Sequence, residues 1–453
     1  MQLSIPIRQL PCRSRHCAEA GLIKKAVGYR LKAGQQAIVA GLAMIEAEAQ
    51  LNHGLDLLSR LPEGSERDQY EISLQVALGA AFTATKGFAA FEAERSYERA
   101  RELCRQQIDH PDFPAVLCGL SMHYMHRSGT PGNDDVNREL LCVAEQRQDA
   151  ATCAIAHWRL AVSALHSGNQ QLAIAHFEQA IAFYDQAERP RFISFTDIRV
   201  SSLNFIALSS LWRGELDEAV ARSHAGLAAA YELGHPYTLS HILHLNCWLH
   251  HHLGDPRTVR ERAEAALKLT AEHGFSMWEM NAAFWQGWAL AAAGDETAGS
   301  AQMRDGVATC RTLGVVNQRP FLLGVLAGTR TQTGHPNEAL PLLTEALALI
   351  ERTQERWFEA ELHRLKAEAL LASAQSNATE AEASLRRAVA VAQRQDVKFW
   401  ELRAATNLAR LWGRQGKRSE ARELLAPVYG WFTEGFDTLD LKEAKGLLDE
   451  LVA

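Results

Sequence analysis

Residues 214–255, GELDEAVARSHAGLAAAYELGHPYTLSHILHLNCWLHHHLGD, contain four glycines, of which Gly214, Gly234 and Gly254 stand at intervals of twenty residues. The same spacing continues along the chain in two interleaved sets: Gly214, Gly254, Gly294 and Gly334, and midway between them Gly234, Gly274 and Gly314. A fixed period of this size indicates a repeat architecture. Each repeat therefore spans about forty residues and consists of two halves.

The segments between the glycines have the pattern of amphipathic helices. Residues 216–234, LDEAVARSHAGLAAAYELG, and 336–353, PNEALPLLTEALALIERT, are rich in Ala, Leu and Glu. Their apolar residues recur at i, i+3, i+4 and i+7, which places them on one face of a helix. Strict alternation, which would indicate strands, is absent, and β-branched clusters are few. The sequence predicts an all-α chain of antiparallel helical hairpins.

Small residues recur at three fixed distances from the first glycine of each repeat. Five residues after it stand Ala26, Ala173, Ala219, Ala339 and Ala421, with Val259 and Gly299 in the other two repeats. Twelve after it stand Ala33, Ala180, Gly226, Ala266, Gly306 and Ala346, with Val428 as the exception, and seven before it stand Ala161, Ala207, Cys247, Gly287, Ala327 and Ala409. Small side chains let helices approach closely, so we expect three close crossings per repeat, with Cys247 as a packing residue.

This arrangement of small residues resembles the tetratricopeptide pattern, whose usual repeat is about 34 residues. The resemblance implies a right-handed superhelix, an α-solenoid, with helices longer than usual by most of a turn. Three further stretches resemble the helical-repeat tail of bacterial adenylate/guanylate cyclase–ATPase signalling proteins. They are residues 424–451, LLAPVYGWFTEGFDTLDLKEAKGLLDEL, residues 355–371, ERWFEAELHRLKAEALL, and residues 82–104, FTATKGFAAFEAERSYERARELC.

The resemblance covers the chain from about residue 16 onward, which predicts four segments. These are an unmatched N-terminal arm at 1–15, N-terminal helical hairpins at 16–130, a regular tetratricopeptide-like array at 131–436 and a C-terminal capping helix at 437–453. The arm leaves open whether the chain is complete or is the tail of a longer signalling protein.

Composition and charge limit the classes of partner. Hydrophobic residues make up 47% of the 453 residues and charged residues 22%, as in ordered globular proteins. The formal net charge of −7 argues against a nucleic-acid partner. The longest apolar run, residues 37–45, has nine residues, whereas a membrane span needs about 20. Eight cysteines without a C-x-x-C pair indicate free thiols in the cytoplasm.

Catalytic motifs are missing from the sequence. It contains no G-x-x-x-x-G-K-[ST] phosphate loop, and residues 413–418, GRQGKR, lack that spacing. H-E-x-x-H, G-x-S-x-G, G-x-G-x-x-G and an aspartate-rich calcium loop are also absent. We therefore expect no enzyme activity and no cofactor.

The His-rich segment 235–253 is the strongest candidate for chemistry. His244, Cys247 and His251 have spacing that suits zinc ligands. Residues at i, i+3 and i+7 of one helix span over about 10 Å of its axis, so one helix cannot close a metal site. Three interpretations remain open: a metal site, structural histidines, and a surface that binds a partner. We prefer the third and expect no bound metal.

In the tetratricopeptide frame the stripe His241, His244, Trp248 and His251 faces the concave surface, and equivalent positions follow in later repeats. The candidate partner-binding residues are His241, His244, Trp248, His251, Asn281, Phe284, Trp288, Phe321, Arg403 and Arg410. Aromatic anchors with a few polar groups suit a binding groove, although the same stripe also fits a core. Gly324 and Gly328 leave space for a pocket against Phe321, and the two arginines suit a carboxylate or phosphate.

We therefore expect a non-catalytic recognition or scaffolding module in bacterial signal transduction or regulation. It would hold a protein segment or a small effector in its concave groove, with a cyclase or signalling ATPase as partner. The alternative is a small-molecule or metal-dependent enzyme centred on the His-rich helix at 235–253. RNA binding is disfavoured by the negative charge and the lack of a basic stripe.

Overall fold

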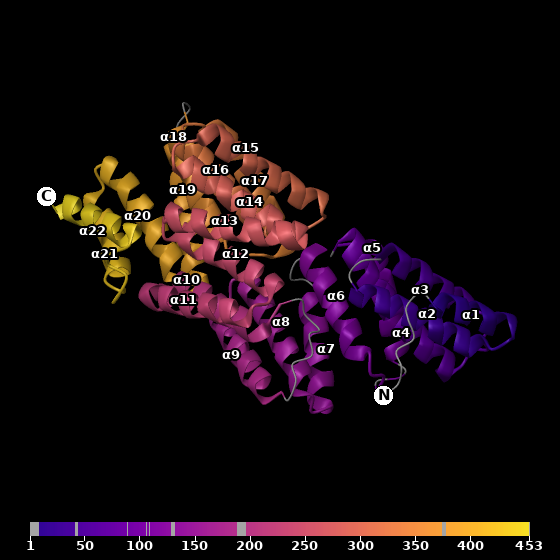
Figure 1. The fold of residues 1–453 in the computed structure, drawn as a ribbon. Helices are drawn as coiled ribbons and strands as arrows, with labels where there is room; N and C mark the ends of the chain where they lie inside the picture. The colour runs from indigo at the N-terminus through magenta and orange to yellow at the C-terminus, as the bar shows by residue number, and fades with distance from the viewer. Residues whose placement is uncertain are drawn as a thin grey trace. The chain divides into compact units, whose positions relative to one another are not determined.

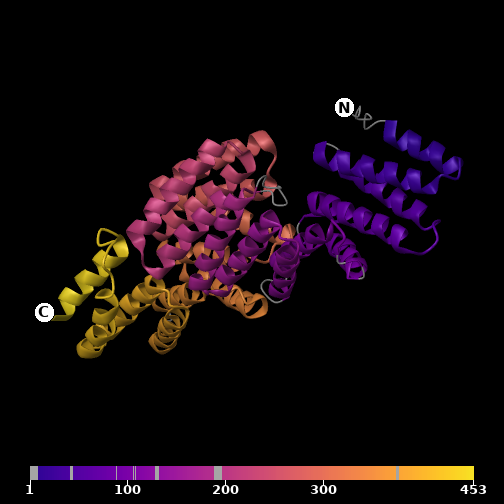
Figure 2. The same cartoon turned by 90° about the horizontal axis from the view of Figure 1, so that it is seen from below.

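The computed structural model describes residues 9–40, 44–87, 89–105, 107, 109–127, 132–187, 196–373 and 377–452. These residues form twenty-two helices and no strand (Figure 1). Consecutive helices pack as antiparallel pairs, which Figure 2 shows from a second direction. The predicted all-α solenoid of tetratricopeptide-like hairpins is confirmed.

The chain divides into two compact units. Unit 1 consists of residues 1–148 and 313–315, and unit 2 of residues 149–312 and 316–453. The helices of unit 1 are α1 (Leu10–Glu19), α2 (Ile23–Ala40), α3 (Met44–Leu58), α4 (Ser65–Lys86), α5 (Phe91–Cys104), α6 (Phe113–Arg127) and α7 (Asn133–Gln146).

Unit 2 contains seven hairpins and a last helix. The hairpins are α8 (Ala150–Ser167) with α9 (Gln170–Gln186), α10 (Ile198–Arg213) with α11 (Leu216–Leu233), α12 (Pro236–His252) with α13 (Pro256–His273), α14 (Ser276–Ala292) with α15 (Glu296–Thr312), α16 (Arg319–Gln332) with α17 (Pro336–Thr353), α18 (Glu359–Ala372) with α19 (Ala378–Gln395) and α20 (Lys398–Arg414) with α21 (Arg418–Tyr429). The last helix is α22 (Leu439–Val452).

The four predicted segments stay a prediction, and the structure divides the chain differently at two of their boundaries. Helix α1 crosses the boundary between the arm 1–15 and the hairpins 16–130, and it is held to α2 because Ser14 Oγ donates to the Ala26 carbonyl at 2.9 Å. The boundary at residues 130 and 131 lies outside the described residues, and the two units divide at residues 148 and 149. Helix α22 lies within the segment 437–453.

The recurring glycines end the helices. Gly214 and Gly234 follow α10 and α11 with φ angles of 101° and 63°, in the left-handed region. A residue without Cβ adopts this conformation at low cost, and the turn satisfies carbonyls at the helix end. Polar side chains cap the starts of helices. Ahead of α13, the Asp255 side chain accepts a hydrogen bond from the Thr258 N–H. The glycine period is therefore a period of helix ends.

The columns of small residues mark the helix crossings, as the sequence predicts. A Cβ atom added at Gly299 in α15 would lie 2.4 Å from the carbonyl oxygen of Gly287 in α14, so neither position has room for a side chain. Ala207, Ala219 and Cys247 are buried to 1% exposure or less. These contacts set the distance between the two helices of a hairpin and between neighbouring hairpins.

Unit 2 closes on itself after five hairpins. The carbonyl of His166, at the end of α8, accepts hydrogen bonds from the Arg356 and Trp357 N–H groups ahead of α18, at 2.7 and 3.2 Å. Helix α10 likewise packs against α20, five hairpins later. The first helices of the hairpins thus surround a common interior, instead of lining an open concave groove.

Candidate partner-binding sites

The predicted stripe on α12 lies inside unit 2. His241, His244 and Trp248 are 7%, 4% and 2% exposed, and His251 is half-buried. The His241 ring stacks on Trp278 with ring centroids 4.9 Å apart, and Trp248 stacks on Trp357 at 5.1 Å. The expectation that this stripe lines an open groove is therefore corrected, because the helices that follow it cover it. A role of these residues in binding stays a prediction.

The candidate metal ligands on α12 take separate partners. His244 Nδ1 accepts a hydrogen bond from Trp285 Nε1 at 3.1 Å, Cys247 Sγ lies 3.8 Å from the Val259 carbonyl, and the His251 ring meets Trp288 edge-on at 4.7 Å. Burial lowers the pKa of His244 well below its ordinary value, so its ring is neutral. Over the described parts of the chain, no group of three or more His, Cys, Asp or Glu side chains is placed to hold a metal ion.

The stripes of the next two repeats are also mostly interior. Asn281 and Phe284 on α14 are fully buried, and Asn281 Nδ2 donates to its own helix at the Met277 carbonyl. Trp288 is half-buried, and Phe321 on α16 is 1% exposed. The structure therefore brings the predicted aromatic residues together, but as parts of one packed cluster.

This central cluster joins helices that are far apart in the sequence. The rings of Trp212 and Trp357 have centroids 4.6 Å apart, and those of Trp248 and Phe321 lie 4.7 Å apart. The Trp400 ring meets His252 edge-on at 5.0 Å. Sequence reasoning omitted Trp212, His252, Trp357, Phe358 and Trp400 from the site, although each lies on or next to the first helix of a hairpin.

The predicted pocket beside Phe321 is filled. A Cβ atom added at Gly324 would lie 2.6 Å from Leu362 Cδ2 and 2.7 Å from Phe358 Cε1. At Gly328 the added atom would lie 3.2 Å from Leu365 Cδ2. The expectation of a pocket is wrong, because α18 inserts its side chains into the space that the two glycines leave.

The two candidate anion-binding arginines are paired with carboxylates of the same chain. Arg403 Nε contacts Asp440 at 2.6 Å, and its Nη1 contacts Glu361 at 2.9 Å. Arg410 contacts Glu443 at 3.3 Å and Asn407 Oδ1 at 3.1 Å. In this conformation the Arg403 guanidinium is paired with two carboxylates, and a role of Arg403 or Arg410 in binding a ligand anion stays a prediction.

The interior of unit 2 contains buried polar atoms without hydrogen-bond partners. Among the described residues of the central cluster these include Nε1 of Trp212, Nε1 of Trp248, Nε1 of Trp400, and both ring nitrogens of His252. Burial lowers the pKa of His252 well below its ordinary value. Native proteins contain few such atoms, and each one indicates strain or an occupant. These donors and acceptors are neutral.

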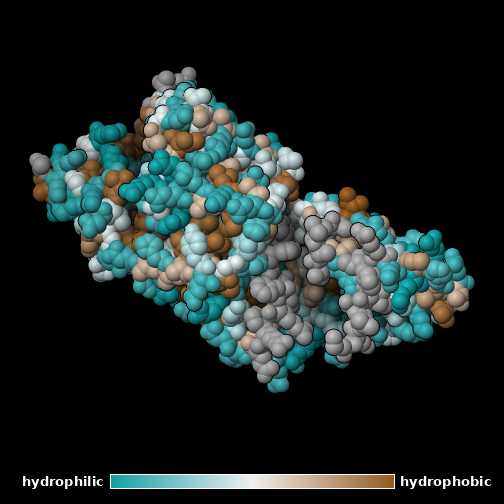
Figure 3. Space-filling view, viewed as in Figure 1, coloured by the Kyte–Doolittle hydropathy of each residue, from teal (hydrophilic) through white to brown (hydrophobic). Residues whose placement is uncertain are grey.

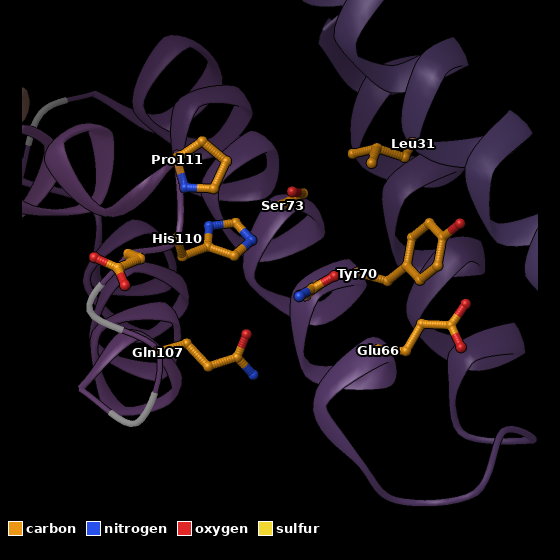
Figure 4. Close-up of a pocket in the computed structure, with 9 residues that line it drawn as sticks. Leu31, Glu66, Tyr70, Ser73, Gln107, His110 and Pro111 are labelled. Atoms are coloured by element: carbon orange, nitrogen blue, oxygen red, sulfur yellow. The ribbon is translucent and has the colours of Figure 1, made fainter.

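Unit 1 contains an open groove of about 690 Å³ between α2, α4 and the residues before α6. It is lined by Leu31, Glu66, Gln69, Tyr70, Ser73, Gln107, Asp109, His110 and Pro111. Figure 4 shows Gln107, His110 and Pro111 on one side of the groove, with Leu31, Tyr70 and Glu66 on the other. Sequence reasoning missed this groove, because its walls come from three segments that are far apart along the chain.

Hydrogen bonds fix one wall of this groove. His110 Nδ1 accepts from the Asp112 N–H at 3.2 Å, and Asp112 accepts from Ser73 Oγ at 2.6 Å. Burial lowers the pKa of His110, so the ring is neutral. The opposite wall presents the exposed Gln69 amide and the half-buried Tyr70. A side-chain amide offers both a donor and an acceptor, which matches the needs of a peptide backbone.

The surface outside these sites is mixed in character. On the face drawn in Figure 3, hydrophilic side chains predominate and hydrophobic ones occur in small groups. The described helices include none that is long and apolar enough to span a membrane.

Comparisons with known proteins agree with the repeat architecture. The tetratricopeptide repeat family model matches residues 402–429, which cover most of α20 and all of α21. An uncharacterized protein of Rhizobium meliloti (strain 1021) is 25% identical over 408 residues, which are 88% of this chain. The chain spans 39% of the length of that relative.

Solved structures match most of the length of this chain, and the Rap structure is similar in fold. A Rap protein complexed with Competence and Sporulation Factor has a TM-score of 0.52 and 15% identity, with 88% of this chain and 99% of that chain covered. Yeast Tom70 has a TM-score of 0.38 and 12% identity, with 98% and 95% covered. A human IFIT1 dimer with m7Gppp-AAAA has a TM-score of 0.42 and 14% identity, with 96% and 97% covered.

Proposed function

We propose that this chain is a non-catalytic recognition module that binds an extended protein segment in the groove of unit 1. The observation that supports this most directly is the groove itself, which is open, about 690 Å³ in volume and lined by side-chain amides, carboxylates and Tyr70. Its size is in the range of pockets that bind specific ligands.

The groove is built to be rigid on one side and adaptable on the other. His110 and Asp112 are held by hydrogen bonds, so they keep their positions without a ligand. Gln69 is exposed and free to turn toward a bound segment. Preorganised walls reduce the entropy that is lost on binding. An extended segment, with one donor and one acceptor per residue, fits this set of groups.

We also propose a biological setting for this role. The sequence resemblance supports a cytoplasmic signalling role with a cyclase or ATPase partner, and a small effector is the other ligand class. The Rap structure, which is similar in fold, was solved with Competence and Sporulation Factor. We expect no nucleic-acid partner, because the net charge is −7.

Site-specific photo-crosslinking tests this proposal. A photoreactive residue at Gln69 should capture a protein in the source cell, whereas the same residue at Tyr231, which is 51% exposed on α11, should not. The identified partner is then purified for binding measurements. Tyr70→Ala should weaken its binding by about 1–3 kcal/mol, as expected for an aromatic anchor.

Tyr231→Ala is the matched control and should leave the affinity unchanged. Equal binding by Tyr70→Ala and wild-type protein would exclude the groove as the binding site. Capture of RNA in place of protein at Gln69 would contradict the proposed partner class.

A further inference from the structure

A second groove in unit 1 lies between α3, α4 and α5, and we call it the α5 groove. Its volume is about 490 Å³. Gln75, Leu78 and Phe82 line it from α4. Because an α-helix has about 3.6 residues per turn, these three positions lie on the side of α4 opposite to Gln69 and Tyr70, which line the groove described above. The two grooves therefore share no lining residue.

The apolar lining of the α5 groove lies at its base. Leu78 is 2% exposed and Leu55 and Phe82 are half-buried, whereas the arginines and most of the glutamates that line the groove are exposed. Lys86 Nζ lies 4.8 Å from the centroid of the Phe82 ring and pairs with Glu92 at 2.6 Å. Burial of apolar surface stabilises a complex in proportion to the area removed from water, so this base favours a ligand with a hydrocarbon or aromatic body.

Two neutral polar side chains of the α5 groove are free to bind a ligand. Gln75 is half-buried and Ser96 is 6% exposed, and neither side chain makes a hydrogen bond to another described residue. The amide of Gln75 and the hydroxyl of Ser96 can each donate to an oxygen atom. Buried polar groups are ordinarily hydrogen-bonded, so a ligand oxygen completes the contacts of Ser96.

The carboxylates of the α5 groove are already paired within the chain. Besides Glu92, which pairs with a lysine, the groove is lined by Glu98 and Glu102. Glu98 accepts a hydrogen bond from the Tyr124 hydroxyl and lies 3.7 Å from Arg101 Nη1. Glu102 pairs with an arginine of the groove at 3.3 Å. A cationic ligand therefore competes with partners that these carboxylates already have.

Arg95 is a cation of the α5 groove that has no such partner. It is exposed, and among the described residues no carboxylate lies within ion-pair distance of it. Arg99, one turn further along α5, differs because it contacts both Glu71 and Glu102. A planar guanidinium binds a carboxylate through two parallel N–H···O bonds. A phosphate, with nearly two charges at pH 7, suits the groove less well, because three glutamates line it.

We propose that the α5 groove binds a small molecule with a single carboxylate and an apolar body. Arg95 pairs with the carboxylate, Ser96 and Gln75 donate to its oxygens, and the apolar body lies on Leu78 and Phe82. A volume of about 490 Å³ is in the range of small-molecule pockets. This site is independent of the recognition of a protein segment proposed above, because it uses a separate groove.

Ligand-detected nuclear magnetic resonance on the full chain tests the proposal, with 4-phenylbutanoate as the probe. The uncharged 4-phenylbutanamide should bind roughly ten-fold more weakly, because it loses a charge-assisted hydrogen bond. Arg95→Gln should weaken binding of 4-phenylbutanoate by about the same factor and leave binding of the amide unchanged. Arg60→Gln, at an exposed arginine in the turn after α3, is the matched control and should change neither affinity.

Charge reversal gives a second readout. Arg95→Glu should bind 4-phenylbutylamine more tightly than 4-phenylbutanoate, and circular dichroism should show the helix content of the wild-type protein, since residue 95 is exposed. Undetectable binding of 4-phenylbutanoate to the wild-type protein, or equal binding to Arg95→Gln, would overturn the site. Tighter binding of the amine than of the carboxylate by the wild-type protein would overturn the ligand class. A preference for the carboxylate that survives in Arg95→Glu would exclude Arg95 as its partner.

Discussion

Single residues of α12 owe their properties to burial. Desolvation lowers the pKa of His241 to about 3 and that of His244 well below its ordinary value, because an imidazolium loses its hydration inside the cluster. Both rings act as aromatic side chains with one polar edge: His241 stacks on Trp278, and His244 accepts from Trp285. A run of histidines that suggests metal chemistry in the sequence is thus a set of neutral packing residues.

This burial predicts loss of stability in acid. An unfolded histidine has a pKa of about 6.5, whereas the pKa of His241 in the folded protein is about 3. Between these pH values the unfolded chain binds a proton that His241 in the folded chain does not bind. The contribution of the neutral His241 to the free energy of unfolding is therefore fully present above pH 6.5, and it decreases as the pH falls toward 3. Between pH 7.5 and 5.5 we expect a loss of roughly 1 kcal/mol for each such histidine, measured by urea unfolding. His241→Phe keeps the ring stacking and should show a smaller loss, and an unchanged pH dependence would contradict the neutral assignment.

Helices pair through positions that have no side chain or a very small one. Gly287 on α14 and Gly299 on α15 face each other so closely that added Cβ atoms would lie 2.8 and 2.4 Å from the opposite carbonyl oxygens. Backbone cannot move aside as a side chain does, so the crossing tolerates no extra volume. The length of each helix, in contrast, is set by the left-handed glycines that follow helices such as α10 and α11.

The close crossing of α14 and α15 predicts that a single added methyl group destabilises the fold. Gly299→Ala should lower the free energy of unfolding by about 1–3 kcal/mol through overpacking, even though alanine favours helix formation. The matched control is Gly446→Ala on α22, where an added Cβ meets no atom within 4 Å. The control should be neutral or stabilising by up to about 1 kcal/mol. Urea unfolding followed by circular dichroism measures both, and equal effects would contradict the close crossing.

At the scale of the whole molecule, closure makes unit 2 differ from an open solenoid. In an open array each repeat contacts only its neighbours, and stability is transmitted along the chain from one repeat to the next. In unit 2 the ends also meet: α8 bonds to the residues before α18, α10 packs on α20, and Glu434, between α21 and α22, bonds to the first turn of α11. Repeats that are five hairpins apart are therefore in direct contact.

Because unit 2 is closed, we expect a destabilising substitution in α20 to lower the amide protection of α12. Trp400→Ala removes a ring that lies 5.0 Å from His252 and 5.6 Å from Phe358. Truncation of a buried tryptophan costs about 3–5 kcal/mol, so amide protection in α12 should fall together with that in α18. Hydrogen exchange with mass spectrometry measures both helices. A loss of protection confined to α18–α22 would show that unit 2 behaves as an open array.

Much of the fold is determined by local sequence. The glycine period sets the helix ends, the i, i+3, i+4 and i+7 pattern sets the buried face, and the columns through Ala219, Ala207 and Gly299 set the crossings. Each of these signals acts within a hairpin or between neighbouring hairpins, so a single sequence is enough to recognise it. The aromatic positions on the first helix of each repeat were also predictable as a group.

Whether that aromatic stripe lines a groove or forms a core was decided only by the tertiary structure. The outcome depends on the small rotation from each hairpin to the next, which accumulates over the array and has no local sequence signal. In unit 2 this rotation returns the chain to its start after five hairpins, so Trp248 meets Trp357 and Arg403 meets Glu361 and Asp440. The groove of unit 1 depends in the same way on distant segments, because Leu31, Tyr70 and His110 become neighbours only when the hairpins stack.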